Sequence, residues 1–333
     1  MHQGETLLTV RDLRVEFPAR GGVTALRGVS LALQGGRTLG IAGESGSGKT
    51  TAGLAAMGLL PPGTRVTGSI RLGERELVGL PEKEYRRVRG RQVAMIFQET
   101  STALNPVLKV GDQLRMATRA HFPGSKDDVR ARIVAALESV RLTDHTRVLR
   151  SYPHELSGGM CQRIVIAMAL SCGSRVLLAD EPTTALDVSV QEEILALLRT
   201  VVAERQLALM LISHDLAFLA DLCDDLVVMY KGQIVEAGSA QSVISSPAHP
   251  YTRALLECIP SLHSRRGTLP ELREYEAPSA QGCGYRHRCP WRADPCLEAP
   301  ALAAVAASAE RSARCWRSAE VLRQSVTESE SVV

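Results

Sequence analysis

A glycine-rich segment, GESGSGKT at Gly43–Thr50, has the residue types and spacing of a loop that binds phosphate. Its glycines let the backbone turn tightly and point successive N–H groups at anionic oxygens. Lys49 can supply a positive charge to the β- and γ-phosphates, and Thr50 can offer its hydroxyl to Mg²⁺. An apolar run precedes the loop and a helical pattern follows it, as phosphate binding at a helix N-terminus requires. The residues predicted to bind the nucleotide here are Gly43, Glu44, Ser45, Gly46, Ser47, Gly48, Lys49, Thr50 and Thr51.

Three further apolar runs end in polar side chains that could act on a bound nucleotide. VLLADE at Val176–Glu181 predicts a buried parallel strand that delivers Asp180 to the Mg²⁺ shell and Glu181 to the attacking water. The next such run leads to His214, which could hydrogen-bond a γ-phosphate, and an earlier one ends at Gln98, which could touch Mg²⁺ or the lytic water. Taken alone, VLLADE is more often a buried strand before an acidic turn, and a lone histidine is more often structural. The predicted catalytic residues are Glu181, His214 and Gln98, and the predicted Mg²⁺ ligands are Thr50, Gln98 and Asp180.

The segment LSGGMCQR at Leu156–Arg163 predicts a second anion-binding site. Its serine and two glycines open a predicted helix over Cys161–Ser171, and a helix N-terminus favours negative charge. One nucleotide does not need two phosphate cradles in one chain, so this cradle is interpreted as serving the nucleotide held by another subunit. The catalytic unit would then be a head-to-tail dimer with ATP between its members. The residues predicted to complete the partner's site are Ser157, Gly158, Gly159 and Gln162.

Together these segments, from Leu7 to about Gly238, resemble the ATP-binding cassette (ABC) ATPases. The resemblance rests on GESGSGKT, Gln98, LSGGMCQR, VLLADE, Ala185–Asp187 and His214. It implies that Phe17 stacks on adenine and that Asp187 crosses the dimer interface. Cys161 departs from the family, which usually has a basic or polar residue there, but this position is not needed for the chemistry.

Three longer segments narrow the resemblance to the dipeptide, oligopeptide and nickel branch of bacterial importers: Arg89–Leu114, Ser151–Met160 and Ser246–Pro260. Within that branch the chain resembles the first of two paired ATPase subunits. The resemblance implies an ATPase that powers uptake of di- or oligopeptides, with nickel or another small solute as alternative cargo. It also implies two permease chains, a sister ABC ATPase that makes the dimer heteromeric, and an extracytoplasmic binding protein acting indirectly. The stretch after Gln98 is where the permease would be gripped. Glu99 stands where the branch often has Asp.

The elements that must position these residues are those of an α/β P-loop cassette. The implied fold is a RecA-like parallel sheet core with an antiparallel β layer, a helical insert at about 99–156 and a small Cys-rich C-terminal extension. Polar and apolar residues alternate over Leu7–Leu33, as an antiparallel layer requires. Helical periodicity follows, with Ser125 and Asp128 as a capping box. We expect an ABC ATPase domain over 1–240 and the extension over 241–333.

Length and composition set limits that agree with this fold. A chain of 333 residues can hold one large α/β domain and an appendage, but not two cassettes. No apolar run approaches the roughly 20 residues of a membrane span, and the first residues show no export signal. We therefore expect a peripheral protein at the cytoplasmic face of the cell membrane. The formal net charge of +3 is too small and too scattered to indicate nucleic acid as a partner.

Four of the eight cysteines gather near the C-terminus, with five, six and eighteen residues between them. Disulfides are unusual in a cytosolic chain, and zinc sites usually contain a closely spaced cysteine pair, so this spacing is closer to iron–sulfur ligation. The tail also resembles the extension of peptide-importer ATPases, which can hold a [4Fe–4S] cluster. Zinc and plain thiols in a packed subdomain stay open as alternatives. The predicted metal ligands are Cys283, Cys289, Cys296 and Cys315.

A rival reading from another class is a soluble cassette protein that acts on nucleic acid or the ribosome, with a zinc-binding tail. Such proteins usually carry paired cassettes, a long insert or a basic face, and this sequence has none of these. A third reading, in which the tail is a redox switch on the ATPase, is compatible with the transporter reading.

Overall fold

The computed structural model describes residues 5–18, 21–98, 103–183, 186–258, 275–277, 281–305 and 308–323. Its strands are β1 (Thr6–Phe17), β2 (Val23–Gln34), β3 (Thr38–Ala42), β4 (Arg65–Leu72), β5 (Arg75–Glu76), β6 (Val93–Ile96), β7 (Val176–Asp180), β8 (Ala208–Ile212), β9 (Asp225–Tyr230), β10 (Gln233–Ser239), β11 (Ala303–Val305) and β12 (Ser308–Ala313). Its α-helices are α1 (Lys49–Met57), α2 (Glu82–Val88), α4 (Val110–His121), α5 (Lys126–Ser139), α6 (His145–Arg150), α7 (Gly158–Cys172), α8 (Val188–Arg205), α9 (Leu216–Leu222), α10 (Ala240–Ser245) and α11 (Pro250–Glu257). The short 3-10 helices are η2 (Pro153–Glu155), η3 (Arg286–Arg288) and η4 (Asp294–Leu297).

The main sheet has the strand order β11-β12-β10-β9-β3-β8-β7-β6. The five strands from β9 to β6 are parallel, whereas β10, β12 and β11 are antiparallel. Strands β3, β7 and β8 are buried along their whole length, which explains why their sequences are continuous apolar runs and not alternating ones. Because the carboxyl ends of parallel strands meet at one edge, the residues that follow β3, β6, β7 and β8 come together there.

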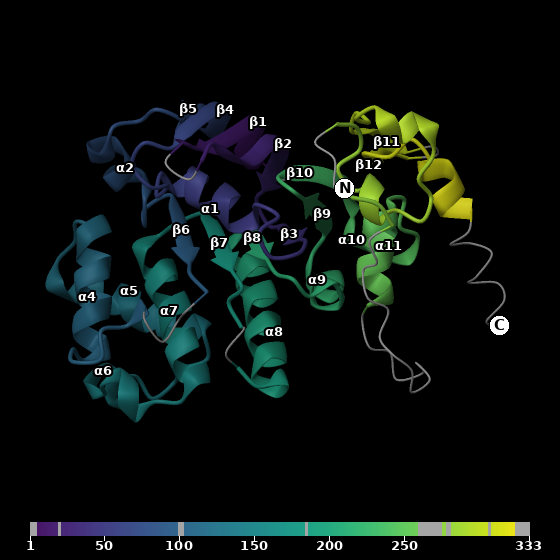
Figure 1. Ribbon diagram of the computed structural model, residues 1–333. Coiled ribbons are helices and arrows are strands. Elements are labelled where there is room, and N and C mark those ends of the chain that lie inside the picture. The colour runs from purple at the N-terminus through teal and green to yellow at the C-terminus, as the bar shows by residue number, and fades with distance from the viewer. Residues whose placement is uncertain are drawn as a thin grey trace.

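A second sheet, with the order β2-β1-β4-β5, forms the predicted antiparallel layer. It lies above the main sheet in Figure 1, with α1 between the two. The alternation in β1 buries Leu8, Val10, Leu13 and Val15 against the core. The β1–β2 hairpin includes Gly21 and Gly22, both with a positive φ.

The helical insert packs α4 and α5 against α7, at the lower left of Figure 1. Helix α5 begins with the predicted capping box, in which Ser125 accepts from the Asp128 N–H and Asp128 accepts from the Ser125 N–H. Its Val129, Ile133 and Leu137 are buried, as the periodicity predicts. The predicted start of the insert, 99–102, lies outside the described residues.

The C-terminal extension joins the cassette by completing its main sheet. Strand β12 pairs with β10, and a fully buried ion pair between Glu236 and Arg311 joins the two strands at 2.7 Å. The extension occupies the right of Figure 1, beside β9 and β10. None of the helices described is both long and apolar enough to cross a bilayer.

Candidate nucleotide-binding site

The glycine-rich loop connects β3 to α1, as predicted from the sequence. Gly43 and Gly48 have φ values of 147° and 102°, and a Cβ on Gly43 would lie 2.3 Å from the Met229 carbonyl oxygen. Glycine is therefore required at that position by both backbone conformation and space. Lys49 is 7% exposed, and its Nζ donates to the carbonyl oxygens of Gly43 at 2.7 Å and Glu44 at 3.0 Å. The loop thus curls around its own ammonium group.

Charge at the loop is balanced between Lys49 and two carboxylates. Burial lowers the pKa of Lys49, and the nearby Glu181, Asp180 and Glu44 oppose this shift. Burial likewise raises the pKa of Asp180, while a hydrogen bond from the Thr50 side chain and the charge of Lys49 act in the opposite direction. Asp180 and Thr50 are therefore adjacent, and they offer a carboxylate and a hydroxyl oxygen, the ligand types that Mg²⁺ prefers.

The three predicted catalytic side chains meet at one carboxylate. Glu181 accepts a hydrogen bond from Gln98 Nε2 at 3.1 Å and lies 3.0 Å from His214 Nδ1. These residues follow β7, β6 and β8, three neighbouring strands of the main sheet. Glu181 has a positive φ of 45°, and its N–H donates to the Ile212 carbonyl at 2.9 Å. This backbone conformation is uncommon for a residue other than glycine and turns the chain sharply as it leaves the sheet.

The segment LSGG forms the start of α7. Ser157 caps the helix by accepting from the Met160 N–H at 3.3 Å. A Cβ on Gly159 would lie 2.8 Å from Val190 of α8, so this glycine allows the two helix starts to approach closely. Gln162, by contrast, is fully buried, so the structure does not bring it to the surface with Ser157. Within the described ranges, no hydrogen bond joins this segment to the glycine-rich loop of the same chain.

The remaining predicted site residues lie at the margins. Asp187 caps α8 by accepting from the Val190 N–H and the Ser189 hydroxyl, which lowers its pKa. Phe17 is half-buried at the end of β1. Cys161 is also half-buried, and its thiol donates to the Pro153 carbonyl, so it faces η2. Ala185 and Glu99 lie outside the described residues.

The four C-terminal cysteines line one closed cavity of about 10 Å³, which is room for about one water-sized sphere. All four are free thiols, and burial raises the pKa of Cys289 to about 12 and that of Cys315 to about 11. Among the residues that the structure describes, however, no group of three or more His, Cys, Asp or Glu is arranged to hold a metal ion. The prediction of a metal site is therefore not supported by the geometry. What the structure provides is the convergence of Cys283, Cys289, Cys296 and Cys315.

A contact that the sequence did not reveal joins this extension to the glycine-rich loop. Arg288 forms an ion pair with Glu44, with Nη1 3.2 Å from both carboxylate oxygens. The Tyr251 hydroxyl accepts from the Glu44 N–H at 2.9 Å. A cavity of about 360 Å³ lies between Glu44–Ser47 and the side of Tyr230, Lys231, His287 and Arg288. The only local sign in the sequence was the position of Arg288 directly before a cysteine.

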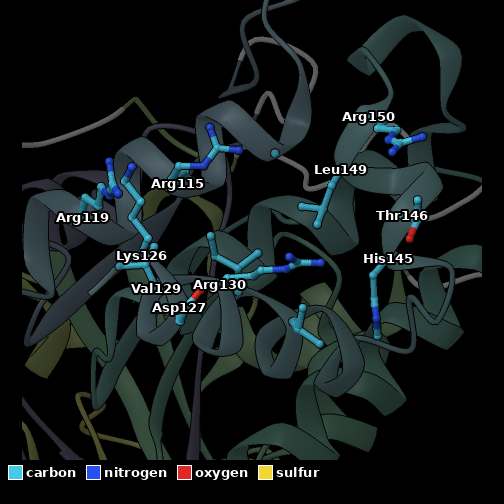
Figure 2. A pocket seen from close by; sticks show the side chains of 13 residues that line it. Arg115, Arg119, Lys126, Asp127, Val129, Arg130, His145, Thr146, Leu149 and Arg150 are labelled. Carbon is cyan, nitrogen blue, oxygen red and sulfur yellow. The ribbon is translucent and has the colours of Figure 1, made fainter. Parts of the chain in front are cut away.

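A second, larger cavity of about 820 Å³ opens on the helical insert, between α4, α5 and α6. Figure 2 shows cationic side chains from all three helices around this hollow. Its ionisable lining is Arg115, Arg119, Lys126, Asp127, Arg130, His145 and Arg150. With a single carboxylate among these groups, the cavity is strongly basic.

Comparison with known proteins agrees with the fold and with this set of motifs. The ABC transporter family model matches residues 26–184, and the model of the oligopeptide/dipeptide transporter C-terminal region matches 235–296. The dimeric structure of MJ0796, a bacterial ABC transporter cassette, superposes with a TM-score of 0.62 at 25% identity, covering 70% of this chain and 99% of that one. The structure of cbiO1 from Clostridium perfringens, part of the ABC transporter complex cbiONQ, gives 0.63 at 25% identity, covering 72% and 90%. Fold and motifs thus define an ABC-type ATPase.

Relatives narrow the class further. The oligopeptide transport ATP-binding protein OppD of Escherichia coli (strain K12) is 42% identical over 308 residues, 90% of each chain. The dipeptide transport ATP-binding protein DppD of Bacillus subtilis (strain 168) is 44% identical over 298 residues, 86% of this chain and 88% of that one. The chain belongs to the oligopeptide and dipeptide transport ATP-binding proteins of the ABC family. The predicted family and the predicted ATPase activity are confirmed.

Proposed function

We propose that this ATPase energises the import of di- or oligopeptides through a membrane permease. The observation that carries the cargo class is the similarity to OppD and DppD over about nine tenths of the chain, together with the match of residues 235–296 to the oligopeptide/dipeptide transporter C-terminal region. Nickel or another small solute remains the alternative cargo that the experiment below distinguishes.

Hydrolysis follows from the side chains around Glu181. The N–H groups of Gly43–Thr51 and the Lys49 ammonium would bind the phosphates, and Phe17 would stack on adenine. Thr50, Gln98 and Asp180 would hold Mg²⁺, which neutralises charge on the β- and γ-phosphates. Glu181 would accept a proton from water as its oxygen attacks the γ-phosphorus, and His214 would hydrogen-bond the γ-phosphate. The support for this is the hydrogen-bonded group of Gln98, Glu181 and His214 beside Asp180.

The complete site would need a second cassette. Ser157, Gly158 and Gly159 at the N-terminus of α7 would bind the γ-phosphate held by the partner ATPase, and Asp187 would contact that partner. Gln162 would act from beneath, by supporting the start of α7, because it is buried. We propose a sister ATPase as the partner, so that the dimer is heteromeric.

The helical insert would dock the two permease chains. The basic cavity between α4, α5 and α6 is suited to an acidic segment of a permease, because cationic side chains line it from three helices. Charge reversal at two exposed positions, Arg119→Glu with Arg130→Glu, is expected to abolish co-purification with the permease. Arg11→Glu, which reverses an exposed arginine on the antiparallel layer, is the matched control. Unchanged co-purification of the double variant would exclude this cavity.

The cysteine cavity is proposed to hold a [4Fe–4S] cluster. Four thiols converge there, and a cluster spreads its ligands over a wider space than one ion does, which agrees with the lack of a single-ion site among the described residues. When bound, the cluster would crosslink the segment and supply a redox centre. Since the cavity has room for about one water-sized sphere, loading must move the thiols outward. Iron, sulfide and zinc assays on anaerobically purified protein test this. About four irons per chain would support it, zinc would replace it, and neither would leave plain thiols.

Domain limits and location belong to the same proposal. We propose an ATPase domain over 1–240 with the insert at about 99–156, an extension over 241–333, and peripheral attachment at the cytoplasmic face of the membrane through the permease. The extracytoplasmic binding protein would act only through the permease.

The deciding experiment is anaerobic co-purification with the membrane fraction, mass spectrometry of the partners, and uptake of labelled peptides and of nickel by reconstituted vesicles. We expect two permease chains, a sister ATPase, and ATP-dependent uptake of peptides that Lys49→Ala abolishes. Nickel uptake without peptide uptake would replace the cargo. Ribosomal or DNA-repair partners would overturn the transport role and leave only the ATPase.

A further inference from the structure

All the polar groups of Glu44, the second residue of the glycine-rich loop, are engaged. Lys49 Nζ donates to its carbonyl oxygen from inside the loop at 3.0 Å. The Tyr251 hydroxyl accepts from its N–H, and Arg288 holds its carboxylate. Two of these three anchors therefore come from the C-terminal extension, 207 and 244 residues further along the chain.

Both anchors are rigidly seated. Tyr251 is fully buried, and its ring lies 4.7 Å from that of Tyr230 and 5.3 Å from that of Tyr285, centroid to centroid. Tyr285 itself is 2% exposed, and its carbonyl accepts from the Arg288 N–H at 3.0 Å. The Arg288 and Glu44 side chains are 23% and 34% exposed, so water screens their ion pair only in part. The contact is thus a packed and partly dry one.

We propose that Arg288 and Tyr251 are positioning residues of the ATPase, which preset the glycine-rich loop in the conformation that binds phosphate. This inference rests on the proposed role of Gly43–Thr51 in holding the nucleotide. Tyr251 fixes the peptide plane that enters the loop. Arg288 fixes the side chain and also neutralises a carboxylate that would otherwise stand beside a polyanionic ligand. Without these anchors, part of the binding energy of ATP would be spent on ordering the loop.

Arg288→Gln and Tyr251→Phe test the proposal in the full-length chain. Each is expected to raise the dissociation constant and the KM for ATP by about three- to tenfold with kcat within about twofold, because the loop is ordered in the ground state and the transition state alike. Arg288→Lys keeps the charge and should recover part of the affinity. The matched control is Arg286→Gln, since Arg286 lies in the same turn but pairs with Glu276.

A double-mutant cycle separates the effect of Arg288 on Glu44 from any other role. Glu44→Gln removes the carboxylate, so adding it to Arg288→Gln should weaken ATP binding less than the sum of the two single changes. Strict additivity would show that Arg288 does not act through Glu44, and would overturn the proposal even if one variant folds poorly.

Lys49→Ala distinguishes failure of this inference from failure of the proposed site. If Lys49→Ala loses ATP while Arg288→Gln and Tyr251→Phe bind it within twofold of the unmodified chain, the site stands and the positioning role is wrong. Equal weakening by Arg286→Gln would reduce the effect to damage of the turn and would also overturn it. If Lys49→Ala binds ATP normally, the glycine-rich loop is not the nucleotide site.

Discussion

At the scale of single residues, Glu181 decides whether the site can hydrolyse ATP. Its carboxylate is held between Gln98 Nε2 and His214 Nδ1, at a backbone turn with positive φ. Glu181→Gln keeps the size of the side chain but removes the base. We expect ATP binding to stay within about twofold and turnover to fall by a factor of about 10² to 10⁴. Single-turnover hydrolysis and equilibrium binding measure the two effects separately, and unchanged turnover would remove Glu181 from its proposed role.

Asp180 gives a pH-dependent prediction at the same scale. Burial raises its pKa in the folded state, so the ionised carboxylate lowers stability at neutral pH. This loss is present above the folded pKa and disappears as pH falls toward the ordinary aspartate value of about 3.9. Asp180→Asn should therefore raise the free energy of unfolding at neutral pH, by a margin that closes below about pH 4, while Mg²⁺-dependent hydrolysis is lost. Urea unfolding across this range measures it. A variant destabilised at neutral pH would contradict the argument.

At the scale of elements, the sequence predicts those parts of the site that depend on strand ends. Continuous apolar runs marked β3, β7 and β8, and the polar residue after each run lies where parallel strands must place it. The burial of Gln162 and the Arg288–Glu44 pair could not be predicted in this way. Both depend on which segments meet across the chain, and periodicity carries no information on contacts at such separations.

The attachment of β12 to β10 is the element whose stability is easiest to test. Glu236 is fully buried and accepts from the N–H groups of Ala248 and His249 as well as from Arg311. Arg311→Met leaves this carboxylate without its cation and should cost about 3–5 kcal/mol. Arg86→Met, which breaks an exposed pair with Glu82, should cost about 0.5 kcal/mol or less. Tryptophan fluorescence during urea unfolding is a direct probe, since both tryptophans lie in the extension. Equal costs for the two variants would contradict the structural role of the buried pair.

At the scale of the whole molecule, the extension and the cassette share one sheet and one hydrophobic core. Strand β12 covers the edge of β10, and Tyr251 and Tyr285 belong to the same buried cluster as the strands that carry the catalytic side chains. A chain cut after residue 240 would expose β10 and remove both anchors of Glu44. We therefore expect residues 1–240 alone to aggregate, or to unfold roughly 10 °C or more below the full chain if several kcal/mol are lost, and to bind ATP more weakly. A chain ending at Arg323, which keeps every described element, is the control. Thermal unfolding and ATP titration of the two forms decide the matter: if residues 1–240 bind ATP with the full affinity, the extension is an appended module and not part of the machine that prepares the phosphate loop.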